Sequence, residues 1–123
     1  AYYHLRLLGD GKQLATAFQG DAPDLPALRT QLADYQALVT EIQNSGVGKD
    51  DPMWGHVQRS ADKLVRTAGR GVERLQQGKP ITAEGLAAER KASGSWLTTD
   101  PEGAQSTILD AYNDLVTTSN RMR

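Results

Sequence analysis

Three arginines in this sequence have the type and spacing of a binding site for a small anion. Arg29, Arg74 and Arg90 each lie beside or near a predicted apolar seam. If the helices run alternately up and down, the connections 20–24 and 78–82 lie at the same end of the molecule. At about 1.5 Å of rise per residue, Arg29 and Arg74 are then within about 10 Å of that end, and Arg90 within about 12 Å.

Guanidinium groups that converge in this way suit a carboxylate, because arginine donates two parallel hydrogen bonds to its two oxygens. The hydroxyl of Thr16, from the first helix, adds a further donor. The sequence therefore predicts a site for a small anionic ligand. The alternative is that the arginine stems cover apolar side chains while their guanidinium groups pair with Asp21, Asp24 or Glu84.

A second basic group follows one face of the predicted helix 52–78. Its members are spaced by four, three and four residues: Arg59, Lys63, Arg66 and Arg70. That helix carries more basic than acidic side chains, whereas the predicted helix 25–44 with its cap is net acidic. The stripe is either a solvated face that neighbouring acidic helices neutralise, or a docking surface for an acidic partner or a second subunit.

No pattern for catalysis or metal binding stands out. His4 and His56 lack the Glu-x-x-His spacing that helical di-iron sites use, and the chain has no cysteine. The glycines of 46–48 lack the spacing of a phosphate-binding loop. We therefore predict no enzyme activity, no catalytic residue, no metal site and no cofactor.

The composition indicates what kind of chain positions these side chains. Of 123 residues, 24 are Leu, Ile, Val or Phe, a fraction close to that of disordered proteins. Disorder usually accompanies a large net charge, and here the net charge is −1. Near neutrality also argues against nucleic-acid binding, and no apolar run has the length of a membrane span. We predict one folded domain over residues 1–123.

Apolar residues spaced by three and four predict an all-α protein. The clearest seam lies in a helix over about 25–44: Leu25, Leu28, Leu32, Tyr35, Val39 and Ile42. Another follows the helix 52–78: Trp54, Val57, Ala61, Leu64, Ala68, Gly71 and Leu75. Aromatic residues in such seams usually belong to the core, although their polar tips can also line a ligand cavity. Asp24, Asp51 and Thr82 are the expected helix caps.

The two ends of the chain give weaker patterns. A first helix over about 2–19 would share a face between Leu5, Leu8, Ala15 and Phe18, although Gly9 and Gly11 interrupt it. A last seam contains Ile108, Tyr112, Leu115, Ser119 and Met122. Its helix either starts near 82 and kinks at Asp100-Pro101 or splits there. We predict an up-down-up-down antiparallel four-helix bundle.

Two segments resemble a known family. The run Leu32-Ala-Asp-Tyr35-Gln-Ala-Leu38-Val39, followed by a glycine-containing loop, is similar to the second helix of bacterial four-helix-bundle sensor domains. The closing Ala111-Tyr112-Asn-Asp-Leu115 helix, which ends in Arg121-Met122-Arg123, is similar to their last helix. Such domains lie outside the inner membrane in chemotaxis receptors and sensor histidine kinases.

The resemblance implies a periplasmic domain of an inner-membrane receptor, which forms a homodimer and meets the membrane only through flanking segments. A chain that begins with Ala rather than Met is expected of such a processed or excised piece. In these receptors a ligand binds between helices, often through arginines that hold its carboxylate, and shifts the last helix.

We therefore expect an extracytoplasmic sensor for a small anionic molecule. Its expected ligand-binding residues are Arg29, Arg74, Arg90 and Thr16. The alternative is a helical adaptor or assembly protein that binds other proteins through the basic stripe Arg59, Lys63, Arg66 and Arg70.

Overall fold

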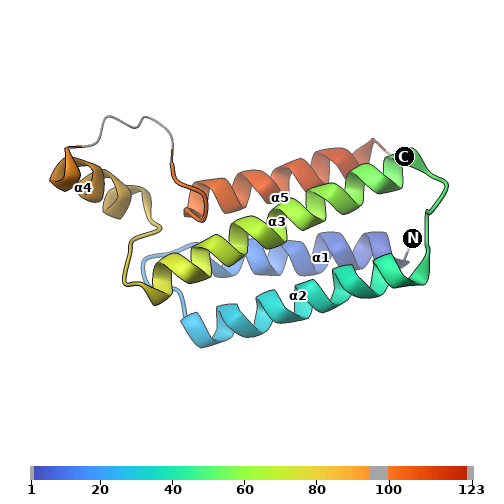
Figure 1. Cartoon of the computed structure of the whole chain (residues 1–123), viewed down its shortest axis with the longest axis horizontal. Helices are drawn as coiled ribbons and strands as arrows, with labels where there is room; N and C mark the ends of the chain where they lie inside the picture. The colour runs from blue at the N-terminus through green and yellow to red at the C-terminus, as the bar shows by residue number, and fades with distance from the viewer. Residues whose placement is uncertain (1, 95–99, 122–123) are drawn as a thin grey trace.

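A computed structural model describes residues 2–94 and 100–121 and shows an all-helical protein, as the sequence predicts (Figure 1). The described residues form five helices: α1 (Tyr2–Ala17), α2 (Leu25–Ser45), α3 (Pro52–Gln76), α4 (Ala83–Ser93) and α5 (Gln105–Asn120). The helices α1, α2, α3 and α5 lie side by side, and α4 leads away from one end (Figure 1).

The predicted four-helix bundle is not confirmed, because the part of the chain that the structure describes contains a fifth helix. The described part of the segment 82–123 contains two helices, α4 and α5, and the backbone at Gly103, just before α5, contacts Gly71 of α3. The helices α1, α2 and α3 alternate in direction, and α5 runs antiparallel to α3 (Figure 1). We call the end that carries α4 the α4 end, and the end where α1 begins and α5 finishes the terminal end.

Three helices begin at the residues that the sequence predicts as caps. Asp24 accepts a hydrogen bond from the backbone N of Ala27 at 3.4 Å, and Asp51 accepts one from Met53 N at 3.0 Å. Thr82 accepts one from Gly85 N at 3.0 Å. Each side-chain oxygen satisfies a backbone N–H that has no acceptor within its helix.

The core follows the seams predicted for α2 and α3 and corrects the one predicted for α1. In α2 and α3 the seam residues are buried, except that Leu25 and Leu75 are partly buried. In α1 the predicted face is wrong at Leu5, which is 64% exposed, whereas Leu7 and Leu14 are 1% exposed. The helix continues through Gly9 and Gly11 without interruption.

Tyr35 explains why α1 contains a glycine at position 11. Its hydroxyl donates a hydrogen bond to the backbone O of Leu7 at 2.9 Å, and the residue is 1% exposed. A Cβ at Gly11 would lie 3.0 Å from that hydroxyl oxygen. The absent side chain lets α1 approach the tyrosine of α2 closely enough for this buried hydrogen bond to form.

A backbone contact between Gly71 and Gly103 positions α5 on α3. A Cβ at Gly71 would lie 2.9 Å from the backbone O of Gly103 and 2.9 Å from side-chain atoms of Phe18 and Ile108. A Cβ at Gly103, whose φ is +97°, would lie 2.6 Å from the backbone N of Gly71. Neither position has room for a side chain, so the segment before α5 lies directly on the α3 backbone.

Gln105 connects the start of α5 to two other parts of the chain. Its side-chain Nε2 donates to the backbone O of Phe18 at 2.8 Å and to that of Gly20 at 2.6 Å. Its backbone N donates to Ile81 O at 2.9 Å. The first residue of α5 therefore satisfies backbone carbonyls at the end of α1 and in the connection before α4.

The Gly71 contact predicts opposite effects for two alanine substitutions in α3. Gly71→Ala should lower the free energy of unfolding by about 1–3 kcal/mol, because the new methyl group collides with Gly103. Gly69→Ala is the matched control, since no atom of the described residues lies within 4 Å of its Cβ position. It should raise stability by about 0.5–1 kcal/mol through helix propensity. Urea denaturation measures both, and equal effects would contradict the contact.

Tyr35 predicts a loss of stability at alkaline pH. Burial, followed by the nearby Asp10 carboxylate, raises the pKa of the Tyr35 phenol above its ordinary value of about 10. Above pH 10 the unfolded phenol loses its proton while the folded one retains it, so stability falls as the pH rises. Tyr35→Phe should cost about 1 kcal/mol at pH 7 through the lost hydrogen bond. Above pH 10 the free energy of unfolding of this variant should fall less steeply with pH than that of the wild type, which urea denaturation at several pH values measures. Equal slopes for the two proteins would contradict the assignment of the alkaline effect to Tyr35.

Candidate functional site

The arginines of the predicted anion site lie toward the α4 end, and Arg74 is bonded there within the chain. Its Nε and Nη2 donate to the backbone O of Pro80 at 3.0 and 2.9 Å. Its Nη2 also donates to both carboxylate oxygens of Glu89 at 3.2 Å. The Arg74 side chain is 14% exposed, so most of its surface is already covered.

Arg90 and Arg29 have acceptors of their own. Arg90 Nη2 donates to the Oδ1 atom of Asp100 at 2.6 Å. With the Gln76 amide oriented so that its oxygen faces Arg29, that oxygen accepts from Arg29 Nε at 2.9 Å and Nη2 at 2.7 Å. Thr16 is exposed near the end of α1. The guanidinium groups thus connect helix ends through separate acceptors, and their convergence on one anion stays a prediction.

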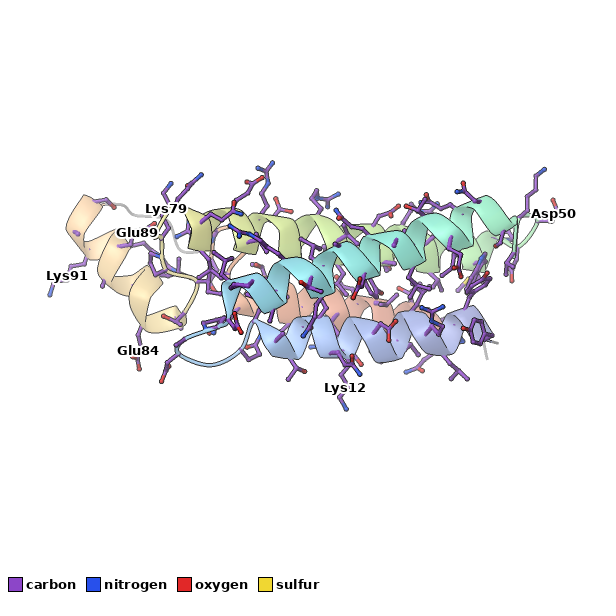
Figure 2. All side chains as sticks on the ribbon, turned by 90° about the horizontal axis from the view of Figure 1, so that it is seen from below. Lys12, Asp50, Lys79, Glu84, Glu89 and Lys91 are labelled. Carbon is purple, nitrogen blue, oxygen red and sulfur yellow. The ribbon has the colours of Figure 1, made fainter. Side chains whose placement is uncertain are left out.

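These contacts hold α4 against the end of α3. Leu86 is the buried residue of α4 and is 2% exposed, so a small apolar contact accompanies the Arg74 bonds. Figure 2 shows Glu84 and Lys91 on the parts of α4 that point away from the other helices. The attachment of α4 therefore depends on a few polar contacts, with Arg74 at their centre.

The basic stripe of α3 is largely paired with acidic groups. Lys63 Nζ lies 2.8 Å from Asp114 Oδ2, Arg66 Nε 3.2 Å from Glu102 Oε1, and Arg70 Nη1 3.1 Å from Glu73 Oε2. Arg59 contacts the Nδ1 atom of His56. Three carboxylates thus neutralise part of the stripe, two of them from α5 and the segment before it, and docking by this face stays a prediction.

A groove between α3 and α5 lies at the terminal half of the stripe. It has a volume of about 530 Å³. The side chains that α3 contributes are Met53, His56, Arg59, Ser60 and Lys63. Those that α5 and its C-terminal cap contribute are Asp114, Thr117, Thr118 and Arg121. We call these nine residues the α3–α5 groove.

The α3–α5 groove is a basic, hydrogen-bonding surface. Arg59, Lys63 and Arg121 line it against a single carboxylate, Asp114, within the described part of the chain. The hydroxyl oxygens of Ser60 and Thr118 lie 3.2 Å apart across it, and Thr118 donates to the backbone O of Asp114 at 2.8 Å. Anions match this lining through ionic hydrogen bonds from the Lys and Arg side chains.

The sequence singled out Arg59 and Lys63 of this groove, as part of the basic stripe, and did not indicate the groove itself or its α5 side. Asp114, Thr117, Thr118 and Arg121 recur at three- and four-residue spacing, on a face of α5 beside its apolar seam. The match between this polar face and the basic stripe of α3 is the sequence signal that α3 and α5 pack together. Met122, which was placed in the seam, lies outside the described residues.

Within residues 2–94 and 100–121, no group of three or more His, Cys, Asp or Glu side chains has an arrangement that could hold a metal ion. None of the helices in that part of the chain has the length and hydropathy needed to cross a membrane.

The fold and the groove define an all-helical protein with a basic hollow between two antiparallel helices. The chain belongs to the family described as "Protein of unknown function (DUF3829)", whose sequence profile matches residues 1–121. Comparisons with curated proteins and with solved structures found no match. The family description names no sensor domain, so the resemblance to sensor bundles stays a prediction.

The Arg74 contacts predict that one substitution loosens α4 selectively. Arg74→Ala removes the donors to Pro80 and Glu89, and a part-buried ionic hydrogen bond contributes about 1.5–3 kcal/mol. Amide hydrogen exchange in 83–93 should accelerate at least tenfold, while exchange in α1 and α2 stays unchanged.

Arg70→Ala is the control for this experiment. It removes an equal charge from the same helix, but its pair with Glu73 is more than half exposed. Exposed pairs contribute about 0–1 kcal/mol, so exchange in α4 should barely change. Equal acceleration by both variants would show that Arg74 does not hold α4.

Proposed function

We propose that this protein binds a small anionic molecule in the α3–α5 groove and acts as the ligand-binding part of an extracytoplasmic sensor. One observation carries the proposal. Arg59 and Lys63 of α3 and Arg121 at the end of α5 line a hollow of about 530 Å³, opposed by Asp114 alone among its described lining residues. Its size falls within the range of small-molecule sites.

The chemistry of the lining favours a ligand with more than one anionic oxygen. Arg59 supplies a planar pair of donors from one turn of α3, and Lys63 supplies an ammonium from the next. The Ser60 hydroxyl of α3 is bonded to the Thr118 hydroxyl of α5, and Arg121 adds a second guanidinium from the end of α5. Such an arrangement suits a dicarboxylate or a phosphate ester, because separate oxygens can accept from each helix.

Binding at this place would affect how α5 sits on α3. Lys63 pairs with Asp114 at 2.8 Å, and Ser60 is bonded to Thr118, so both contacts cross the groove. An anion competes with Asp114 for Lys63 and thereby changes the contacts between the two helices. A displacement of the last helix is how a sensor domain would pass on ligand binding.

The positions of the helix ends also support a sensor. The start of α1 and the finish of α5 lie at the same end of the molecule (Figure 1). A domain placed between two membrane-spanning segments needs this arrangement. The periplasmic location, the receptor of the inner membrane and the homodimer belong to this proposal and rest on the sequence resemblance.

The proposed site differs from the one expected from the arginine spacing. Arg29, Arg74 and Arg90 lie toward the α4 end and bond to Gln76, Pro80 and Asp100, whereas the groove opens near the terminal end. In sensor bundles of the resembled type the ligand binds at the end far from the membrane. A ligand in the groove would instead lie nearer the ends of α1 and α5.

The proposal predicts that some small anions stabilise the folded protein. A panel of mono-, di- and tricarboxylates, inorganic phosphate and phosphate esters is tested by thermal shift. A ligand at a hundred times its Kd stabilises by about 2.7 kcal/mol, which raises the Tm by several degrees. Arg59→Gln should weaken binding of the active compound at least tenfold in isothermal titration calorimetry, because a charge-assisted hydrogen bond is lost.

Arg66→Gln provides the matched control. Arg66 belongs to the same basic stripe and loses the same charge, but it pairs with Glu102 outside the groove. The Arg66→Gln variant should bind the active compound as tightly as the wild type does. If no compound raises the Tm, or if both variants weaken binding equally, the groove is not the site. If Arg29→Gln and Arg90→Gln abolish binding instead, the site lies at the α4 end.

A further inference from the structure

A second cavity lies at the terminal end, between the start of α1 and the connection from α2 to α3. It has a volume of about 510 Å³, and the rings of Tyr2, Tyr3, His4 and Trp54 line it together with Gly48 and Asp51. Figure 2 shows Asp50, in the same connection, at the end of the molecule opposite α4. We call this cavity the aromatic pocket; it shares no lining residue with the α3–α5 groove.

The aromatic rings that line the pocket lie at different angles to one another. The centres of the Tyr2 and Tyr3 rings are 5.5 Å apart, and their planes are tilted by 57°. His4 and Trp54 meet edge to face, with ring centres 6.4 Å apart and planes at 86°. Several aromatic faces and edges around one cavity are the arrangement with which proteins recognise substituted ammonium ions.

The charges around the pocket favour a cation. Asp51 is the lining residue with a permanent charge among those that the structure describes, and that charge is negative. The Tyr2 ring already attracts a cation, since the guanidinium carbon of Arg6 lies 5.5 Å from its centre. An anion would meet a carboxylate and the electron-rich faces of the rings, so the pocket and the groove select opposite charges.

Within the part of the chain that the structure describes, Trp54 contributes an unpaired hydrogen-bond donor to the wall of the pocket. The residue is 4% exposed, and its indole Nε1 has no acceptor among the described residues. A Cβ at Gly48 would lie 1.9 Å from Cδ1, so the edge of the indole next to Nε1 lies against this pocket-lining glycine. A buried N–H without an acceptor costs free energy. Because this N–H belongs to a residue that lines the pocket, its resonance can report whether the pocket is occupied.

We propose that the aromatic pocket binds a small organic cation, a quaternary or N-methylated ammonium, as a free solute. The aromatic rings and the Asp51 carboxylate hold the ammonium group. The site does not depend on the proposed anion groove, because the two cavities have different lining residues and ligands of opposite charge. Failure of either proposal therefore leaves the other intact.

Choline and its uncharged isostere 3,3-dimethyl-1-butanol test the proposal. Both have the same shape and a hydroxyl, but only choline is a cation. The probe is the indole N–H resonance of Trp54 in the full chain, assigned with a Trp96→Phe variant. Choline should shift this resonance in a saturable way with a Kd of about 1 mM or tighter, whereas the isostere should bind at least tenfold more weakly. Equal binding of both, or no shift with choline, would overturn the proposal.

Two substitutions locate the site without disturbing the core. Tyr2 is 65% exposed, so Tyr2→Leu removes a ring at little cost to the fold, and it should weaken choline binding by roughly threefold to tenfold. Asp51→Asn removes the charge but keeps an oxygen that can cap α3 at Met53 N, and it should weaken binding similarly. Asp24→Asn makes the same change at the cap of α2 and should leave binding unchanged. Equal effects of the two Asn variants would overturn the placement.

A lipid headgroup is the other source of the same ammonium chemistry. Sedimentation with vesicles of phosphatidylcholine is compared with sedimentation with vesicles of phosphatidylglycerol, which lacks the ammonium group. A free-solute site predicts no excess of protein on the phosphatidylcholine vesicles. An excess that choline displaces would overturn the free-solute assignment.

Discussion

The contact between the backbones of Gly71 and Gly103 determines where α5 can lie, and most of the structure depends on that position. Because neither residue has a side chain, the segment before α5 lies on α3 at distances that a Cβ would forbid. From this fixed point α5 runs back along α3 and brings Asp114 within 2.8 Å of Lys63. The position of the groove between α3 and α5 therefore depends on the close approach of the Gly71 and Gly103 backbones toward the α4 end.

The same junction explains why α4 stands apart from the other helices. The first residue of α5, Gln105, bonds to the end of α1 and to Ile81, so the chain before and after α4 is fixed at neighbouring points. The helix α4 can therefore extend away from α1, α2, α3 and α5 without disturbing the packing of those four helices. Arg74, Arg29 and Arg90 then form polar contacts between helix ends, and the bonds of Arg74 to Pro80 and Glu89 hold α4 in place.

Sequence patterns predicted the parts of the fold that depend on local periodicity and missed those that depend on close approach. The seams of α2 and α3 and the caps at Asp24, Asp51 and Thr82 are where spacing placed them. Of the residues predicted for the inner face of α1, Ala15 and Phe18 are buried and Leu5 is not. The buried face also contains Gly11, which contacts Tyr35, and a hydrophobicity pattern does not indicate a buried glycine. One acceptor of Arg74 is the backbone carbonyl of Pro80, which no side-chain pattern indicates, and the other is the Glu89 carboxylate. Predicting the α5 side of the groove requires knowing that α3 and α5 pack together, although α4 and its connections separate them in the sequence.

The first turns of α3 lie between the two cavities, and this placement gives them a physical connection. Met53 and His56 line the α3–α5 groove, whereas Trp54 and the cap residue Asp51 line the aromatic pocket. A ligand that binds Asp51 alters the charge at the start of α3, and one that contacts His56 and Arg59 acts roughly one to two turns further along the helix. At its other end α3 is held by the Gly71 contact. A helix fixed at one end and lined by two sites at the other can couple them, and any such coupling must act equally in both directions.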